Sequence, residues 1–457
     1  MKNKLFALYI VFAGLSTSFT SCELEEIGDP NNPSVSLVTQ NPSKGQLQTL
    51  VTGLEYTSRA YLQTAANAQG TFGREVWYFN SNDGRNIQYW TGQRGLVNGL
   101  PDANFYGVGS LYTSPYTSIK QGNLLIDAVK SSNLLTENEK TAYTGFAKTI
   151  QAYQYLVVAN AQYKNGIRVD VYDEFNPGPV VSYEDALQHI RNLLDESYDE
   201  LQKSGATLPF KLSAGYASFH TPQGLGKVNR ALASRVAIYQ KDWQGALNLL
   251  PLSFFDLDGN LNAGPAHVYG TPPSESYNPF YYILGANLAT LPVPHPLFVE
   301  EAIPGDKRIK DKIYERENPI INTVSDVPLS SKYQDKRWTS DTSPVVYLRN
   351  EELILIYAEA SAQTGKTAEA VRAVNRIREA AEIGEYTGET SLEALTDEIL
   401  LQRRYSLWFE PAGHRWVDLR RYDRLNEIST ALDGGAVFPQ LDKPLAEINW
   451  DEYINNK

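Results

Sequence analysis

Cysteine is almost absent from this chain of 457 residues: its single cysteine, Cys22, leaves no possibility of a disulfide bond within the chain. Hydrophobic runs are also short. After residue 21, none approaches the eighteen or so uninterrupted apolar residues of a membrane-spanning helix. Basic residues are not in excess, because 41 Lys and Arg stand against 53 Asp and Glu, a formal net charge of −12. Nucleic-acid binders neutralise phosphates with clustered Lys and Arg, so nucleic acid is not an expected partner.

Signature motifs of common catalytic sites are missing as well. The five histidines are scattered and form no HExxH or similar ligand pair, and no GxSxG, P-loop or GxGxxG motif occurs. A metal site, a His-dependent nucleophile and a cofactor are therefore not predicted. A carboxylate pair is the exception, because a glycosidase needs only two acids that the fold brings together, and 53 acids offer many pairs.

The composition is otherwise that of a folded protein. Hydrophobic residues make up 42% of the chain and charged residues 21%, which lies in the globular range. Aromatic side chains are abundant, with 7 Trp, 29 Tyr and 16 Phe. Such enrichment suits either a binding surface or a large core.

The N-terminus has the pattern of a secretory signal peptide over residues 1–21. Two lysines precede an apolar stretch at 5–15, and small polar residues lead to Cys22. A cysteine in this place is similar to the lipid acceptor of Bacteroidetes lipoproteins, and residues 22–42 form an acidic tether rich in Pro and Asn. This similarity implies a lipid on Cys22 that anchors the protein in the outer membrane. Glu23, Glu25 and Glu26 resemble the acidic tag that marks such lipoproteins for export, which implies that the protein faces the cell exterior. The alternative is an ordinary signal peptide that is cut elsewhere.

Helical periodicity dominates residues 43–457, which we predict to form a single domain. Apolar residues recur at helical spacing, in several cases after Ser, Thr or Asp caps. The predicted helices are 45–68, 114–130, 137–163, 183–204, 224–240, 243–250, 349–364, 367–382 and 392–409. Clear strand pairs are scarce. The predicted fold class is therefore all-α.

Two helix pairs resemble tetratricopeptide units. In residues 358–370, small side chains line one helix, Gly365 ends it, and a small residue lets the next helix pack closely. Residues 233–250 repeat this scheme. With weaker partners at 114–163 and 183–204, the sequence predicts about four tetratricopeptide-like helical hairpins.

Two long insertions, residues 70–113 and 251–347, interrupt the helices. Both are rich in Gly, Pro, Asn and aromatic residues and lack a helical period. Structureless insertions of this size in a compact protein are usually functional, so we expect the ligand-binding residues there.

The first insertion mixes rings with amide and charged side chains. A sugar has apolar C–H faces and a rim of hydroxyls, so its site needs flat aromatic platforms and planar donors and acceptors. We predict Trp77, Tyr89 and Trp90 as platforms. The predicted site also includes Arg74, Tyr78, Asp83, Arg85, Asn86, Tyr281, Tyr282 and Trp338. The alternative is that half of the rings bury the loop and that Asp83 and Arg85 form a structural turn.

The chain carries five motifs, in order, that resemble the SusD/RagB family of nutrient-binding outer-membrane lipoproteins. The matching segments are Asp306–Arg308 with Lys332–Tyr333, Pro344–Ala360, Val374–Arg378, Ile399–Arg421, and Phe438–Pro439 with Pro444, Glu447 and Asn449. Two departures from the family pattern, Gln402 and Pro411–Ala412, bear on how Arg403 and Arg415 pair. Charges on inner helices survive burial only when they are paired, so we interpret Glu359, Arg378, Arg415 and Asp418 as scaffold.

The resemblance implies an all-helical, tetratricopeptide-containing protein at the cell surface. It implies a partner, a SusC-like TonB-dependent barrel, to which the protein delivers captured oligosaccharides, and it implies no catalytic residues. Three alternatives remain: a peptide-binding member of the same family, a surface glycoside hydrolase, and a scaffold whose loops contact no small ligand.

Overall fold

The computed structural model describes residues 39–173, 175–271 and 275–456. The predicted signal peptide, Cys22 and most of the predicted tether lie outside these residues. The first described helix, α3 (Lys44–Thr57), begins where the sequence predicts the folded body. None of the helices in the described part of the chain is long and apolar enough to cross a membrane.

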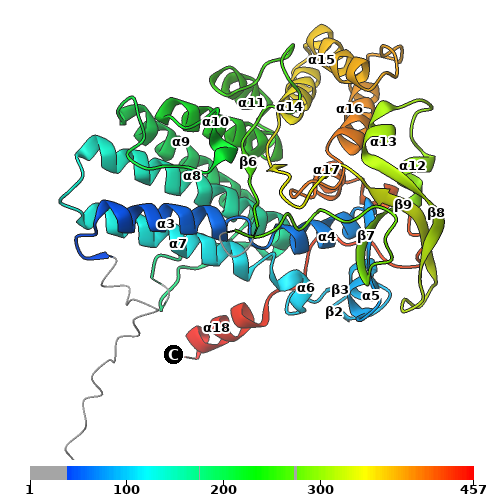
Figure 1. Ribbon diagram of the computed structural model, residues 1–457, viewed down its shortest axis with the longest axis horizontal. Helices are drawn as coiled ribbons and strands as arrows, with labels where there is room; N and C mark the ends of the chain where they lie inside the picture. The colour runs from blue at the N-terminus through cyan, green and yellow to red at the C-terminus, as the bar shows by residue number, and fades with distance from the viewer. Residues whose placement is uncertain (1–38, 174, 272–274, 457) are drawn as a thin grey trace, which may run out of the picture.

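The scaffold is a row of helices in which each packs against the next (Figure 1), as the all-α prediction requires. After α3 these are α7 (Thr113–Ser131), α8 (Glu137–Gln162), α9 (Tyr183–Lys203), α10 (Pro222–Tyr239), α11 (Trp243–Leu249), α14 (Asn350–Gln363), α15 (Thr367–Ala380) and α16 (Leu392–Ser406). Their bounds match the predicted ranges closely, except that 45–68 is broken. There α3 ends at Thr57, and α4 (Leu62–Phe72) begins a new helix.

Local signals explain where these helices begin and end. Ser43 and Thr136 form capping boxes with Gln46 and Glu139, in which each side chain satisfies the other residue's backbone N–H. Side chains at the N-caps of α9, α10, α11 and α16 accept from the first turn: Ser182, Thr221, Asp242 and Ser391. These caps satisfy N–H groups that have no partner inside the helix.

The two clearly predicted hairpins correspond to packed pairs, α10 with α11 and α14 with α15, and the weaker one at 114–163 corresponds to α7 with α8. The helix predicted at 183–204, α9, packs between α8 and α10. Gly365 ends α14 with φ +74°, a left-handed conformation that glycine adopts without a Cβ clash. Ala358 and Ala370 are fully buried where α14 meets α15. Small side chains therefore allow the close approach that the sequence predicts.

The two insertions contain regular structure, so the prediction of structureless segments is wrong. The first holds β1 (Val76–Asn80), α5 (Arg85–Thr91), β2 (Leu96–Val97), β3 (Leu100–Pro101) and α6 (Tyr106–Gly109). The second holds β6 (Ala266–His267), β7 (Thr290–Pro294), α12 (Pro296–Glu300), α13 (Lys307–Lys312), β8 (Ile313–Asn322), β9 (Leu329–Asp335) and β10 (Val345–Val346). The pairing partners lie far apart in sequence for β1–β7 and β6–β10, and such pairs leave no hairpin signal.

The antiparallel pair β1–β7 joins the two insertions. Trp77 lies opposite Val293, and Phe79 lies opposite Leu291. These side chains pack with Leu329 in a small apolar cluster separate from the main core. Burial of this cluster fixes the first insertion against the second.

Two further helices lie near the C-terminus of the chain: α17 (His414–Arg421) and α18 (Leu445–Asn455). The short strands β4 (Ile167–Arg168) and β5 (Val180–Val181) pair with each other beside α8. Helix α18 projects from the lower edge of the molecule in Figure 1.

Of the four charges interpreted as scaffold, three form ion pairs as predicted. The pairs are Glu359 with Arg421 (Oε2 to Nη2, 2.7 Å), Asp418 with Arg403 (2.6 Å) and Arg378 with Glu398 (2.7 Å). Arg415 instead donates from Nε to the carbonyl of Gly73 at 3.0 Å, and burial lowers its pKa to about 10. Gln402 donates to Glu398 at 2.7 Å, which a glutamate there would not do.

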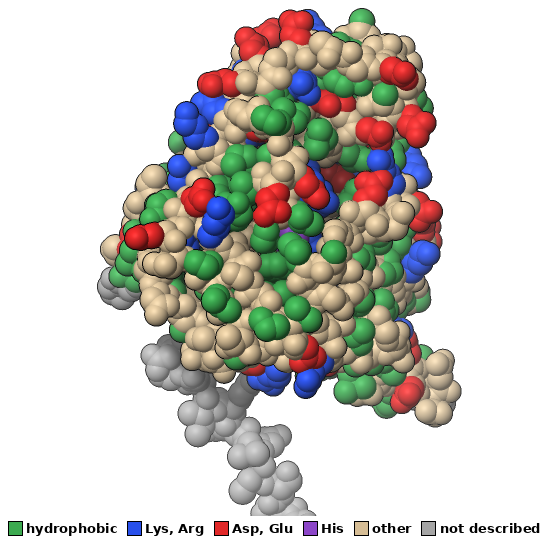
Figure 2. Space-filling view, turned by 90° about the vertical axis from the view of Figure 1, so that its right-hand side faces the viewer, with side chains coloured by type: hydrophobic (Ala, Val, Ile, Leu, Met, Phe, Trp, Pro, Cys, Tyr) green, Lys and Arg blue, Asp and Glu red, His purple; other side chains and the backbone are tan. Residues whose placement is uncertain are grey.

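The surface mixes charges of both signs. On the face that Figure 2 shows, Lys and Arg side chains alternate with Asp and Glu, and hydrophobic side chains lie between them. That face offers no basic patch for a phosphate backbone.

Candidate functional site

The buried half of the first insertion contains the two predicted tryptophan platforms. Trp77 and Trp90 are each 1% exposed, so no sugar can stack on either ring, and the prediction that they are platforms is wrong. The Trp77 indole donates to Asp433 Oδ2 at 3.2 Å. Arg74 is 3% exposed and forms a buried ion pair with the same carboxylate at 2.7 Å, so it too is structural. The predicted alternative, in which rings bury the loop, holds for this half.

Three further predicted rings support the fold from half-buried positions. Tyr78 packs against Trp90 with ring centroids 5.5 Å apart, and burial raises the pKa of its phenol. Tyr282 accepts from Gln63 Nε2 at 2.7 Å and packs against the apolar cluster at β1–β7. Tyr281 is half-buried next to it. Tyr78 and Tyr282 therefore have contacts that hold them in the fold.

The exposed half of the insertion begins at the turn between β1 and α5. Asn80 Oδ1 accepts from the backbone N–H groups of Asn82 and Asp83 at 3.0 and 3.2 Å, which sets the turn. Asp83 Oδ1 then accepts from the Arg85 backbone N–H at 3.0 Å. The Arg85 guanidinium returns to this carboxylate at 2.7 Å, yet 56% of the Arg85 side chain stays exposed. The predicted structural turn is therefore present, and it presents its charged groups to solvent.

Tyr106, at the first position of α6, completes this surface. It was not predicted, and it is 56% exposed. Its hydroxyl donates to Asn86 Oδ1 at 2.7 Å and lies 2.9 Å from Asp83 Oδ2. The Arg85 guanidinium lies over the Tyr106 ring, 5.6 Å from its centroid.

We call these residues the Asp83–Tyr106 patch: Asp83, Arg85, Asn86, Tyr89 and Tyr106. The half-buried Tyr89 supports it from below through Phe105, with ring centroids 4.8 Å apart, and Phe105 in turn contacts Tyr106 at 4.4 Å. Of the predicted residues, the patch unites Asp83, Arg85, Asn86 and Tyr89. Asn86 is only 2% exposed, so it holds Tyr106 in place and does not itself face a ligand.

The electrostatics of the patch come from this network. Hydrogen bonds from Arg85 hold the pKa of the Asp83 carboxyl well below its usual range, so it stays ionised. Partial burial, together with the Asp83 contact, raises the pKa of Tyr106 to about 12. The patch thus presents a neutral ring beside an ion pair whose two charges balance. An exposed ring with fixed planar donors and acceptors matches the faces and rim of a sugar.

Sequence reasoning missed Tyr106 and Phe105, although both lie in the predicted insertion. The available signal was the ring pair itself, at positions 105–106 of a segment already singled out. No pattern in the sequence indicates that Tyr106 contacts Asn86, which lies 20 residues away.

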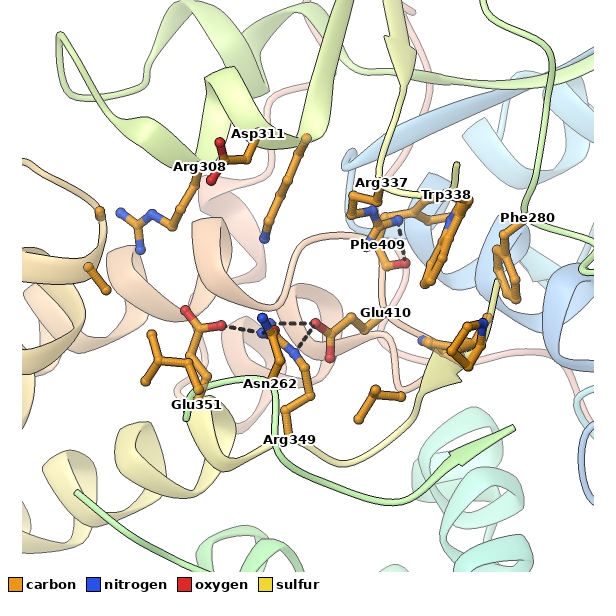
Figure 3. Close-up of a pocket in the computed structure, with 18 of the residues that line it drawn as sticks. Asn262, Phe280, Arg308, Asp311, Arg337, Trp338, Arg349, Glu351, Phe409 and Glu410 are labelled. Atoms are coloured by element: carbon orange, nitrogen blue, oxygen red, sulfur yellow. Dashed lines mark hydrogen bonds and ion pairs between the residues drawn. The ribbon is translucent and has the colours of Figure 1, made fainter. Parts of the chain in front are cut away.

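Trp338, the last predicted residue, lies elsewhere. It lines a cavity of about 480 Å³ that also contacts α13, the start of α14 and the segment after α16. Figure 3 shows Trp338 between Arg337 and Phe280, with Arg349 reaching Glu351 and Glu410 across the cavity. The structure therefore separates Trp338 from the Asp83–Tyr106 patch.

The C-terminal third of the chain matches a known protein family. A model of the SusD family matches residues 311–457. The curated SusD-like protein P38 of Formosa agariphila is 33% identical over 102 residues, which are 21% of this chain and 20% of that protein. The aligned part thus spans about a fifth of that relative's length.

Solved structures extend the similarity to almost the whole chain. NanU of Bacteroides fragilis superposes with a TM-score of 0.62 at 17% identity, covering 92% of this chain and 97% of NanU. The surface glycan-binding protein A of Bacteroides thetaiotaomicron, in complex with laminarihexaose, has a TM-score of 0.63 at 14% identity and covers 88% and 97%. At these identities the likeness establishes the fold.

Proposed function

We propose that this chain, which belongs to the SusD/RagB family, is a non-catalytic glycan-binding protein of the cell surface and that the Asp83–Tyr106 patch is its glycan site. The observation that carries the proposal is an exposed aromatic ring, Tyr106, held beside fixed donors and acceptors. The laminarihexaose complex of the relative with the same fold supports an oligosaccharide as the ligand.

The charge balance within the patch favours a glycan over a peptide. Asp83 and Arg85 satisfy one another, so neither offers an uncompensated charge to a peptide terminus. Neutral hydroxyls, in contrast, can bridge the exposed edges of such a pair.

The same geometry argues against hydrolysis at the patch. A glycosidase needs one carboxyl that holds a proton and a second that is ionised. Asp83 is the single carboxyl among the patch residues, and its lowered pKa keeps it ionised.

Anchoring and delivery complete the proposal. A lipid on Cys22 would hold the protein in the outer membrane, and a SusC-like TonB-dependent barrel would receive the captured oligosaccharide. The family motifs of residues 306–449 and the lipoprotein-like N-terminus support this assignment.

Calorimetric titration of the purified protein tests the site. Laminarihexaose, other neutral oligosaccharides and short peptides are compared on the parent, on Tyr106→Ala and on a matched control, Tyr172→Ala. Tyr172 is 60% exposed and bonds to Asp127, away from the insertion. We expect Tyr106→Ala to weaken oligosaccharide binding about tenfold or more, and Tyr172→Ala to leave it unchanged.

Each other result contradicts a stated part of the proposal. Equal oligosaccharide binding by the parent and by Tyr106→Ala shows that the patch is not the binding site. Binding of peptides but of no oligosaccharide changes the ligand class. Shortened oligosaccharide in a chromatogram of the recovered ligand shows that the protein is an enzyme.

A further inference from the structure

A cleft of about 650 Å³ lies along α3. Other residues that line it come from the segment between α9 and α10 and from the second insertion, among them Ser213, His267 and Glu275. A volume of this size is in the usual range for small-molecule sites. The lining residues do not belong to the Asp83–Tyr106 patch, so the cleft is a separate feature of the surface.

The charged side chains that line the cleft sum to one negative charge. Two are carboxylates, Glu55 and Glu275, and one is the guanidinium of Arg59. Arg59 pairs with Glu275 at 2.8 Å and also donates to the carbonyl of Val268. His267 adds no charge, because burial lowers its pKa to about 3. One carboxylate is therefore left without a cation of its own.

Glu55 is that carboxylate. Its Oε1 accepts from the Ser213 hydroxyl at 2.7 Å and from the Ser213 backbone N–H at 3.2 Å, which fixes its orientation. Within the part of the chain that the structure describes, Glu55 forms no ion pair. Burial raises the pKa of its carboxyl more than the Ser213 hydrogen bonds and the charge of Arg59 lower it. Since a half-buried carboxylate without a contacting cation is costly, a cationic ligand would stabilise it.

An exposed ring lines the same cleft. Tyr56 follows Glu55 in α3 and is 50% exposed, and the Arg59 guanidinium lies 5.9 Å from its ring centroid. A flat exposed ring suits the apolar C–H face of a sugar. Thr49 lies seven positions before Tyr56, so it shares this face of the helix. Its hydroxyl donates to the carbonyl of Gly45 at 3.1 Å, which leaves the oxygen free to accept from a sugar hydroxyl.

We propose that the cleft along α3 binds an amino sugar whose amine is a free ammonium. The ammonium pairs with Glu55, the sugar ring stacks on Tyr56, and a hydroxyl donates to Thr49 Oγ1. An ammonium has three donors and no acceptor, which matches a carboxylate that lacks a cation. The exposed ring and the threonine hydroxyl favour a sugar over a lysine side chain, which would use neither contact. The site is independent of the Asp83–Tyr106 patch.

Calorimetric titration of the purified protein tests the proposal with the disaccharide of D-glucosamine and with its N-acetylated form. The two share one ring skeleton, and acetylation replaces each ammonium by a neutral amide. Salt at about 0.15 M screens the long-range attraction between an acidic protein and a cation. Under these conditions we expect the glucosamine disaccharide to bind at least about tenfold more tightly, because only its ammonium balances Glu55. Nα-acetyl-lysine amide, the third ligand, should bind more weakly than this disaccharide, because it has no ring to stack on Tyr56.

Two variants locate the binding. Glu55→Gln removes the charge but keeps an oxygen that accepts from Ser213, so the two disaccharides should bind about equally. Because burial disfavours the charge at this position, Glu55→Gln should be at least as stable as the parent. Tyr56→Ala should weaken the glucosamine disaccharide about three- to tenfold. Glu196→Gln makes the same change in charge on α9, where the side chain is 64% exposed, and as the matched control it should bind like the parent.

The outcomes separate this proposal from the proposed function. A preference for the glucosamine disaccharide that is lost in Glu55→Gln but kept in Tyr106→Ala supports a second site, for amino sugars. Equal binding of the two disaccharides by the parent overturns the proposal, as does an unchanged preference in Glu55→Gln or undiminished binding by Tyr56→Ala. Tighter binding of the lysine amide than of the disaccharide also overturns it, in favour of a peptide ligand. Absence of binding of the glucosamine disaccharide to the parent overturns it too, and leaves the result for neutral oligosaccharides at the patch unaffected.

Discussion

Both the buried and the exposed parts of the first insertion combine rings with charged side chains, but the two parts have opposite fates. Residues 74–79 lie in the core, where Arg74 and Trp77 share the carboxylate of Asp433. Asp83, Arg85 and Tyr106 instead present an ion pair and a ring to solvent. The difference teaches that composition singles out a segment rich in candidate binding residues, while distant partners decide which of its side chains are exposed.

The largest expected effect is in the buried half. Arg74→Met leaves Asp433 buried with its charge uncompensated, so the free energy of unfolding should fall by about 3–5 kcal/mol. Urea unfolding measures this loss. The double variant Arg74→Met/Asp433→Leu removes both charges and should recover much of it. An unchanged midpoint for Arg74→Met alone would show that the pair is not structural.

The next effect depends on pH. Glu75 is 2% exposed, and burial raises its pKa from 4.5 to about 7. Between these values the folded protein holds a proton that the unfolded chain has released, so stability falls as pH rises through this window. Glu75→Gln removes that dependence, and relative to the parent it should gain about 2–3 kcal/mol between pH 5 and pH 8. The same difference in unfolding free energy between parent and Glu75→Gln at pH 5 and at pH 8 would contradict a raised pKa of the buried Glu75 carboxyl.

A smaller effect is expected where the halves meet. A Cβ on Gly107 would lie 2.5 Å from Trp90 Cζ2 and 3.0 Å from Asn86 Nδ2. Gly107→Ala should therefore lower the free energy of unfolding by about 1–3 kcal/mol, because the added methyl group overpacks this site. It should also weaken oligosaccharide binding, because it displaces Asn86 from Tyr106. Gly205→Ala, in which the new Cβ contacts nothing within 4 Å, serves as a comparison for binding.

The smallest effect on stability is expected in the exposed half. Tyr106→Ala removes a ring that is 56% exposed, so the free energy of unfolding should change by about 1 kcal/mol or less. The urea midpoint checks this, and the same sample used for titration shows that weaker binding is not unfolding. A loss as large as that of Arg74→Met would remove the distinction between the halves.

Much of the fold could be predicted because its signals are local. The capping boxes at Ser43 and Thr136 and the left-handed Gly365 act within one turn of their helices. The break after Thr57 was missed, since the helical period continues across it. The strands of the insertions were missed because β1 pairs with β7, more than 200 residues away.

The candidate site was predicted in part. Asp83, Arg85 and Asn86 lie within four residues of one another, so a turn followed by a helix brings them together. Trp77 and Trp90 carry the same chemistry as exposed rings, and no local pattern marks them as buried. Glu55 and Glu275, which lie far apart in the sequence, line one cleft only in the folded chain.

The sequence by itself determined the helices, their caps, the hairpin packing and the segment in which we propose the glycan site. Each depends on residues a few positions apart, whose interactions follow from helical or turn geometry. Only the tertiary structure decided that Trp77 is core and that Tyr106 is surface. Burial depends on partners such as Asp433, 359 positions from Arg74, and no periodicity records a contact over that distance.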